Sequence, residues 1–405
     1  MADSSAIRYL QIAKQDAGVT EVPGSTEFNF VDFQGDPIYA DSAPNKVEVQ
    51  LQRDDGEMAE AVEGQRTGGI NFTTLIRGTG DGASDEVSSD PAELSVLMDV
   101  ACGFDGQLGT GTVCDGTTQA VGQLDVEAGD GAQFKDGTSG TDCPSALIVN
   151  SSQSIAQWEA REVTGVSTDA LTLDRDLQGV PAAAAPVYAA TSWYIDADNP
   201  EHDTVYADIE GTAFRDILLG CGANFTINMD PTTPLAQIEW ALMANDIDYD
   251  DSLATPTYSA PTSAGGIPVK NCPFWWGSTK TTLRSLSIAS GLDLKPKKST
   301  EGAQGNAGWL YEYSGAKISG ELYYDHTIFK NAQGSTADTV DVAVQIGPTS
   351  ASDTDGNCLY VRIPNMQLMG MVKASADGVD VMQFEGVARR PSAGNGSIRF
   401  HLFGG

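Results

Sequence analysis

The C-terminal stretch from 357 to 403 constrains the fold more than any other part of the chain. Apolar and polar residues alternate along 359–365 and again along 383–389, which is the pattern of strands with one buried face. The first run ends at Pro364, and Asp377-Gly378 marks a tight turn between the two runs. The stretch therefore predicts consecutive antiparallel strands, and it contains no set of catalytic residues.

Similar runs recur along most of the chain and predict a mainly β fold, either a β-sandwich or a barrel. The 44 glycines gather between these runs, as expected for many short strands joined by turns. With 40% hydrophobic and 20% charged residues, the chain has the composition of a folded protein and not of a disordered one. No repeat of short fixed period is visible. The expected strands cover 46–52, 70–77, 146–149, 160–166, 171–173, 187–193, 204–214, 223–229, 235–242, 283–294, 315–324, 340–346 and 398–402.

One α-helix is predicted, and it begins near Asp90. Asp90 can cap its first turn, Pro91 suits the first helical position, and Glu93 completes a capping box. Gly103 provides the stop. We expect this helix to pack on one face of a sheet through an apolar stripe formed by Leu94, Leu97, Met98 and Ala101.

The composition changes after Gly103, where 106–140 is rich in Gly, Thr and Asp before alternating runs resume. This change predicts a small barrel-like β-domain inserted into a larger one. The expected organisation is a first part of the main domain over 1–103, the inserted domain over 104–192, and a second part of the main domain over 193–405.

The formal net charge of −33 limits the partners of the chain. A protein that coats nucleic acid needs Lys and Arg to replace the counterions of the phosphates, so we expect no stable binding of nucleic acid. An acidic surface can instead repel nucleic acid, or keep a protein soluble at high salt. No secretory signal or membrane-spanning run is visible, so the sequence predicts a protein made in a cytoplasm, with no membrane association.

No motif predicts catalysis, a cofactor or a metal site. None of the six cysteines forms a CxxC pair, and no nucleophile elbow accompanies the three histidines, which we expect to be solvated or on edge strands. Asp246, Asp248 and Asp250 resemble the start of a calcium loop, but Asp251 and Thr257 stand where an EF-hand needs Gly and Glu. On a strand, the three carboxylates would form an acidic ladder on one face.

Two clusters stand out as contact candidates. Lys295, Lys297 and Lys298 form the one basic cluster, which could touch nucleic acid but in so acidic a chain is better suited to pair with carboxylates of a neighbouring subunit. Phe274-Trp275-Trp276 is expected in the core, with a subunit interface as the alternative.

The order of these strands and turns resembles the tail tube proteins, or major tail proteins, of tailed bacteriophages and related viruses. The resemblance covers nearly all of the chain except 104–192, and each of its motifs is a pattern of strand and turn. Besides the C-terminal stretch, it is carried by the segments 9–23, which looks like an opening arm, 68–72, 90–102, 283–295 and 302–308.

The resemblance implies a structural virion protein and not an enzyme. It implies a tail-tube-type β-sandwich flanked by a helix, and hexameric rings in which strands of adjacent subunits complete a barrel. Stacked rings would form an acidic channel through which viral DNA passes transiently, and the implied partners are tail terminator, tape measure and baseplate proteins. The loop 53–69 is long enough to reach a neighbouring ring, and the inserted domain would lie outside the tube. The expected contact residues are Arg53, Asp54, Asp55, Glu57, Glu60 and Glu63 in this loop, together with Lys295, Lys297 and Lys298.

Two other functions are compatible with the sequence. Another virion protein, such as a capsid decoration or baseplate component, would share the β-rich pattern without catalytic residues. A secreted carbohydrate-binding or hydrolytic protein is disfavoured by the missing signal and by the lack of an obvious pair of convergent carboxylates.

Overall fold

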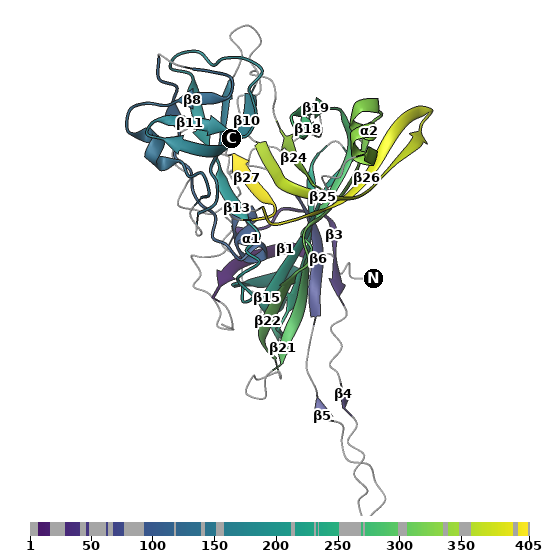
Figure 1. Cartoon of the computed structure of the whole chain (residues 1–405). Coiled ribbons are helices and arrows are strands. Elements are labelled where there is room, and N and C mark those ends of the chain that lie inside the picture. The colour runs from purple at the N-terminus through teal and green to yellow at the C-terminus, as the bar shows by residue number, and fades with distance from the viewer. Residues whose placement is uncertain are drawn as a thin grey trace, which may run out of the picture.

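The structure is a computed structural model, and it is mainly β, as the sequence predicts. Its described part contains a large antiparallel sheet, a smaller six-stranded sheet that curls like half a barrel, and two α-helices (Figure 1). The residues that the structure describes are 7–16, 29–40, 46–47, 62–63, 68–76, 93–116, 119–138, 142–150, 158–211, 215–230, 232–233, 235–250, 269, 272–298, 306–334, 339–347, 358–391 and 396–403.

The first half of the large sheet, which we call the first repeat, is built around four neighbouring strands and a helix. β3 pairs with β6, β6 with β16, and β16 with the C-terminal half of β15. The N-terminal half of β15 lies between β14 and β17, and β14 leads to β1 and β2. The elements are β1 (Ile7–Gln15), β2 (Asn29–Phe30), β3 (Phe33–Ala40), β4 (Lys46–Val47), β5 (Val62–Glu63), β6 (Gly68–Leu75), α1 (Glu93–Cys102), β14 (Thr204–Gly211), β15 (Arg215–Met229), β16 (Gln237–Ala244) and β17 (Asp246–Asp250).

The second half, the second repeat, has the same elements in the same order. β20 pairs with β23, β23 with β26, and β26 with the C-terminal half of β25. The N-terminal part of β25 lies between β24 and β27, and β24 leads to β18 and β19. The elements are β18 (Phe274–Trp276), β19 (Thr279–Thr281), β20 (Leu283–Ala289), β21 (Leu292–Lys298), β22 (Asn306–Tyr313), β23 (Lys317–Tyr323), α2 (His326–Gly334), β24 (Thr339–Ile346), β25 (Cys358–Ala376), β26 (Val379–Ala388) and β27 (Arg399–Phe403).

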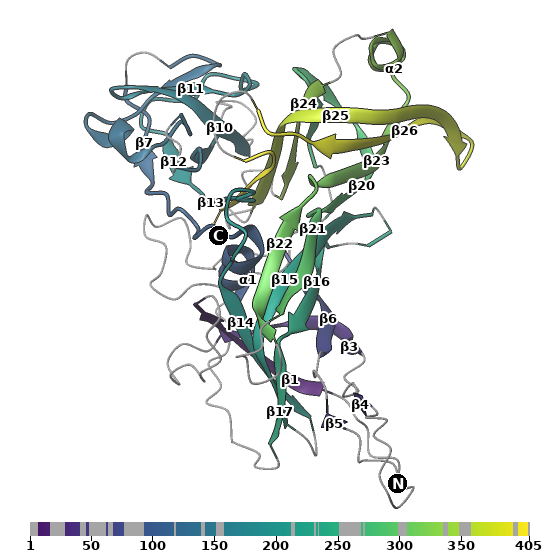
Figure 2. The same cartoon turned by 60° about the horizontal axis from the view of Figure 1, so that its bottom comes forward.

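Each repeat also carries a two-stranded hairpin at the same place in its chain order. In chain order, β4 and β5 come between β3 and β6, and β21 and β22 come between β20 and β23. Each pair forms its own two-stranded hairpin. Both hairpins project toward the same end of the large sheet (Figures 1 and 2). The two repeats are joined directly, because the C-terminal end of β15 pairs antiparallel with β20. We call this pairing the internal joint.

The helix predicted from Asp90 is confirmed over Glu93–Cys102. Its whole predicted apolar stripe is buried, and it packs against strands β1, β13 (Thr191–Tyr194), β14 and β15. Gly103 ends it in a left-handed conformation, with φ 65° and its N–H bonded to the carbonyl of Asp99 at 3.0 Å. Asp90 and Pro91 lie outside the described residues.

The prediction of a single helix is wrong, because α2 occupies the equivalent place in the second repeat. Asp325 caps it, since its carboxylate accepts hydrogen bonds from the N–H groups of Thr327 at 2.8 Å and Ile328 at 3.0 Å. Ile328 is buried against the core and Phe329 packs on it. With so few apolar positions, the segment gives only a weak helical pattern in the sequence.

The six-stranded sheet is formed entirely by residues between α1 and β14, and it has its own core. Its strand order is β7-β12-β9-β10-β11-β8, and we call it the insertion sheet. In the second repeat, the equivalent connection from α2 to β24 is only a few residues long. The prediction of an inserted β-structure agrees with this arrangement; the boundaries 104 and 192 stay a prediction. The strands are β7 (Thr112–Val113), β8 (Gln123–Asp125), β9 (Ala146–Asn150), β10 (Trp158–Ser167), β11 (Ala170–Leu173) and β12 (Pro186–Ala189).

Three details of the strand predictions need correction. The segment expected to be an arm is instead β1 of the large sheet over Ile7–Gln15. The runs 46–52 and 70–77 suggest two strands joined by a long hairpin loop, but β6 pairs with β3 and β16, and only Lys46–Val47 of the first run is described. The run 283–294 is two strands, β20 and β21, which are separated at Gly291 with φ 73°.

The strand that was expected to end at Pro364 continues to Ala376 as β25. Pro364 can lie inside it because the ladder to β24 is irregular there, with Val342 opposite Ile363 but Val340 opposite Met366. On its other side, β25 changes partner from β27 to β26 at the same place. No ladder hydrogen bond therefore depends on the missing N–H. The Asp377-Gly378 turn is confirmed, with φ 53° and 77°.

Candidate functional site

Six neighbouring strands of the large sheet, β6, β16, β15, β20, β23 and β26, have one apolar and one polar face, and this polar face is the candidate functional surface. Along β16, residues with even numbers such as Ile238 and Trp240 are buried, whereas Glu239 is exposed and Gln237 half-buried. The same alternation holds in β6, β15, β20, β23 and β26 because neighbouring strands are paired in register. The buried side chains of both repeats meet in one core, which includes Phe225, Trp240 and Phe384.

The polar face runs without interruption through both repeats and across the internal joint. Thr226 lies opposite both Glu239 on β16 and Ala289 on β20, so the row continues from one repeat into the next. Its polar and charged members are Asn71, Thr73, Asn224, Thr226, Asn228, Gln237, Glu239, Ser285, Ser287, Lys317, Ser319, Glu321, Gln383 and Glu385. Most of these are uncharged. The exposed apolar side chains of Met243, of Ile38 opposite Asn71 and of Val372 opposite Gln383 lie on the same face.

Hydrogen bonds between neighbouring strands order several of these side chains. Ser287 Oγ donates to Asn228 Oδ1 at 2.8 Å, across the internal joint. Gln383 Nε2 donates to Glu321 Oε1 at 2.7 Å, within the second repeat. Such a surface is hydrophilic, and the side chains that are bonded to each other in this way are not free to bind a ligand.

The polar face carries few charged residues, and their net charge is negative. Glu239, Glu321 and Glu385 are opposed by Lys317, and Arg284 at the end of β20 is held by Glu321 at 3.4 Å and by Asp377. Most of the net charge of −33 must therefore lie elsewhere on the chain. A face of this kind provides few counterion-releasing contacts to a phosphate backbone.

The polar-faced sheet ends in two open edges, which are edges without a partner strand in the described part of the chain; at the β25 edge, the carbonyl of Met371 accepts a hydrogen bond from Gln333 Nε2 of α2 at 2.8 Å. Within the described part of the chain, β3 pairs only with β6, and the C-terminal half of β25 pairs only with β26. Large apolar side chains stand at both edges: Ile38 on β3 is 68% exposed, and Met369 and Val372 on β25 are 63% and 57% exposed. Exposed edges with apolar side chains are sites where another strand can add.

Of the residues predicted as contacts, Glu63 lies in β5 and the three lysines lie in β21. Arg53, Asp54, Asp55, Glu57 and Glu60 lie outside the described residues.

The basic cluster lies on β21, in the equivalent hairpin of the second repeat. Lys295 contacts Glu312 on the neighbouring strand β22, and lies 3.8 Å from Asp293. Lys297 pairs with Glu201 at 2.5 Å. All three lysines are at least partly exposed, so these partners within the chain leave them reachable by a second molecule. Their role as contacts between subunits stays a prediction.

A buried ionic cluster, missed at the sequence level, fixes the insertion sheet to the large sheet. Glu162 on β10 is fully buried and lies 2.5 Å from both Arg362 on β25 and Arg399 on β27. Burial alone would raise the pKa of Glu162, but the two guanidiniums and His401 overcome this and hold it well below its usual range. The cluster continues through Asp174, Arg175, Asp341 and Tyr360.

The same cluster contains a serine, a histidine and a glutamate in a chain of hydrogen bonds. His401 Nδ1 lies 2.8 Å from Ser192 Oγ, and His401 Nε2 lies 3.2 Å from Glu162 Oε2. All three residues are at most 1% exposed, so a substrate cannot reach the hydroxyl. The arrangement is a structural junction and not a nucleophilic site.

The expectation of solvated or edge-strand histidines is wrong for two of the three. His401 lies in the buried cluster, and His202 stacks on Tyr311 with ring centroids 3.7 Å apart. His202 Nδ1 lies 2.9 Å from the carbonyl oxygen of Val100, and burial lowers the pKa of this histidine. Residues brought together from distant segments leave no local signal in the sequence. His326, at the start of α2, is exposed as expected.

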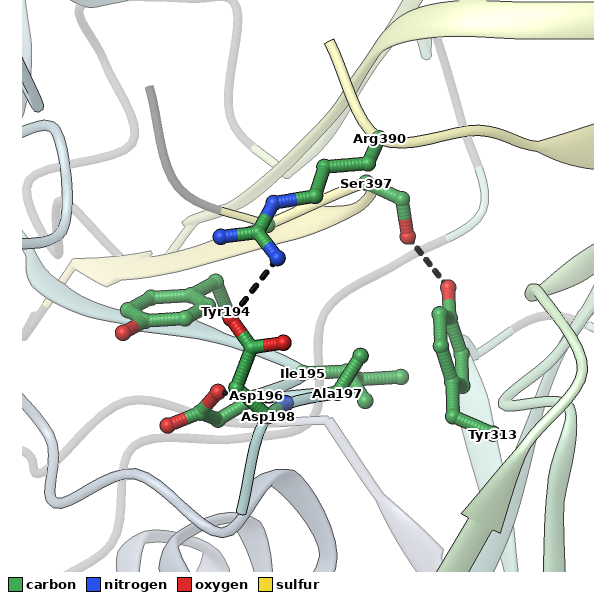
Figure 3. Close-up of a pocket in the computed structure, with 9 residues that line it drawn as sticks. Tyr194, Ile195, Asp196, Ala197, Asp198, Tyr313, Arg390 and Ser397 are labelled. Atoms are coloured by element: carbon green, nitrogen blue, oxygen red, sulfur yellow. Dashed lines mark hydrogen bonds and ion pairs between the residues drawn. The ribbon is translucent and has the colours of Figure 1, made fainter. Parts of the chain in front are cut away.

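A small pocket opens beside the junction, at the ends of β13 (Thr191–Tyr194), β26 and β27 (Figure 3). Its volume is about 120 Å³, well below the 300 Å³ or more of typical ligand pockets. Arg390 spans it to Asp198 at 2.7 Å, and the hydroxyl of Tyr313 bonds to Ser397. Because its polar groups are paired and its room suits a few water molecules, it carries no ligand argument.

Two further motifs, the aspartate run at 246–250 and the aromatic run at 274–276, lie in strands. Asp246 and Asp248 lie on β17, the strand expected for an acidic ladder. In the described part of the chain, no three His, Cys, Asp or Glu side chains gather as metal ligands. Phe274 and Trp275 are buried, which confirms the core interpretation for both. Neither described helix has the length and hydropathy of a membrane-spanning segment.

Comparison with known proteins supplies no relative: no protein-family model matches the chain, and no curated protein matches it. The polar face, its two open edges and the projecting hairpins are therefore the features from which a function can be inferred.

Proposed function

We propose that this protein is a structural subunit of a viral tail tube. Copies join edge to edge into rings, the rings stack, and the polar face lines a channel for DNA delivery. The observation that carries the proposal is the single polar face of six neighbouring strands, flanked by β3 and β25, whose outer edges are open.

Ring closure accounts for the two edges. A sheet whose opposite edges are both open and both bear exposed apolar residues can satisfy them by pairing head to tail with copies of itself. The closed sheet then has an inside and an outside. Because the apolar face is already filled by the core, the polar face is the one available to line the bore.

The chemistry of the polar face suits passage rather than binding. Duplex DNA is held by proteins that supply many Lys and Arg contacts to its phosphates. The face offers mainly Ser, Thr, Asn and Gln, with exposed Glu239 and Glu385 to repel phosphates. DNA would therefore slide through the bore without being retained.

The two hairpins suit contacts between stacked rings. Both project toward the same end of the sheet, so in a stack they would contact the opposite end of the next ring. Five of the six predicted contact residues at 53–63 are acidic, and 295–298 contains three lysines. Complementary charges on the next ring could then hold stacked rings in rotational register.

The other expected partners follow from the resemblance alone. A tail terminator, a tape measure protein and baseplate proteins would cap, fill and anchor such a tube. The insertion sheet lies to one side of the large sheet (Figure 1), which is compatible with a position outside the tube. The virion tail would be its final location, after synthesis in the host cytoplasm.

Electron microscopy of the purified protein in negative stain tests this function. We expect rings or tubes of uniform diameter with a stained central channel. Ile38→Lys, which places a charge at the open β3 edge, should give monomers. Val180→Lys, at a similarly exposed apolar residue on the insertion, should still assemble. Wild-type protein that remains monomeric at every salt concentration would refute the proposal.

A further inference from the structure

We infer that each ring contains three chains and not six, because every chain supplies two tube units, and that β25 of one chain pairs with β3 of the next. The register of this joint is the one that β15 and β20 adopt at the internal joint. This inference rests on the proposed tube function, and it specifies that the partner at each open edge is another copy of the chain and that three copies close the ring.

The duplication of the large sheet is the first support. Each element of the first repeat has a counterpart with the same neighbours in the second repeat, from β1 and β18 at the start to β17 and β27 at the end. Seven strand pairings in one repeat correspond to seven in the other. Each repeat supplies four strands to the polar-faced sheet and one helix behind it.

The internal joint shows how one unit binds the next. β15 and β25 are counterparts, and so are β20 and β3. Within the chain, the outer edge of β15 is filled by β20. The counterpart edge of β25 and the counterpart edge of β3 are the two open edges. One antiparallel pairing between copies would therefore repeat the internal joint around the whole ring.

The counterpart positions also give the register. Thr226 on β15 lies opposite Glu239 on β16, and Val372 on β25 lies opposite Gln383 on β26. Because Glu239 and Gln383 occupy equivalent places in the two repeats, Thr226 corresponds to Val372. Ala289 corresponds to Ala40, since they pair with Lys317 and Gly69 at equivalent places on β23 and β6.

At the internal joint, Thr226 pairs with Ala289, and Asn228 pairs with Ser287. Between copies, Val372 should therefore pair with Ala40, and Ala374 with Ile38. Ile38 and Val372, two exposed large apolar residues of the two edges, then come to the same small region of the joint.

The width of the channel also favours three chains. With strands about 4.8 Å apart and tilted by about 40°, twenty-four strands close into a barrel roughly 50 Å across at the backbone. Side chains reduce this to a bore of about 35–40 Å, which clears a DNA duplex about 20 Å wide. Six chains would contribute forty-eight strands and a barrel of about 100 Å, far wider than the DNA requires.

The insertion allows the chains of a ring to be counted in electron micrographs. It occurs in the first repeat only, between α1 and β14, so each chain carries one. Electron-microscopic top views of rings or tube segments should therefore show three peripheral projections and threefold symmetry. Six projections would overturn the inference on copy number but leave the tube function standing, whereas a preparation without rings would overturn the tube function itself.

Covalent cross-linking tests the register. In a Cys272→Ser background, whose five other cysteines are buried, Ala40→Cys and Val372→Cys are combined in one chain and treated with a short bismaleimide. Directly opposed residues lie close enough for this reagent, with Cβ atoms about 5 Å apart. We expect denaturing gels to show species of two and three chains, of about 85 and 128 kDa from a chain of 42.6 kDa, and none larger.

Matched variants make each result decisive. Thr226→Cys with Ala289→Cys places the same pair at the internal joint and should cross-link within one chain only. Val372→Cys alone should give no ladder. A ladder that continues to six chains would overturn the threefold ring. Absence of cross-linked species from preparations that contain rings would overturn the register.

Discussion

Removal of the Glu162 carboxylate should reveal how strongly the insertion sheet is held. Glu162→Ala deletes the carboxylate that lies 2.5 Å from two guanidiniums in a fully buried site. Loss of one partner from a buried ion pair costs about 3–5 kcal/mol because the remaining charge stays buried. Arg362 keeps Asp341 at 2.8 Å and Asp174 at 3.6 Å, so we expect the lower end, about 3 kcal/mol.

Urea unfolding followed by tryptophan fluorescence measures this loss. Glu385→Ala is the matched control, since it removes an exposed carboxylate of the same sheet and should change the free energy of unfolding by less than about 0.5 kcal/mol. The double variant Glu162→Leu with Arg399→Met should regain most of the stability, because apolar replacement of both partners removes the buried charge. If Glu162→Ala and Glu385→Ala cost the same, the cluster does not hold the insertion.

Three further outcomes are expected. Glu239→Lys with Glu385→Lys should give tubes that retain DNA at low salt and release it as salt rises, in a filter-binding assay where wild-type tubes retain none. Lys297→Glu should permit rings but shorten tubes in electron micrographs; full-length tubes would exclude this residue from ring stacking. Because burial lowers the folded-state pKa of His202, its unfolded form takes up a proton first as the pH falls below about 6.5, so stability should fall toward pH 5.5. His202→Phe should flatten that slope in urea titrations, and an unchanged slope would assign it to other groups.

Local patterns were enough to predict much of the fold. Alternation in 235–242 gave β16, and the apolar stripe with Gly103 gave α1, because each depends on neighbours within a few residues. Pro364 misled the strand prediction, since whether a proline interrupts a strand depends on the partner strands, which change there. The missing N–H carries no cost at such a place.

The candidate site was less accessible from the sequence because it arises from long-range pairing. Glu239 and Glu385 look like ordinary exposed positions of separate strands, and only the register through β15 and β20 places them on one face. Glu162, Arg362 and Arg399 come from three distant strands and form one buried cluster. The duplication was also hidden, because equivalent strands share a pattern of burial and pairing but few identical residues.

The difference between the internal joint and the two open edges follows from what each must supply. The internal joint joins units that are already tethered, so the chain itself keeps the partner strands at high effective concentration. Polar residues such as Thr226 and Ser287 can therefore occupy it. A joint between separate chains must also offset the translational and rotational freedom lost on association. The exposed apolar side chains of Ile38 and Val372 can contribute that extra free energy by leaving water. The divergence of the two edges from the internal joint is thus what a duplicated unit should show when only one of its two joints is intermolecular.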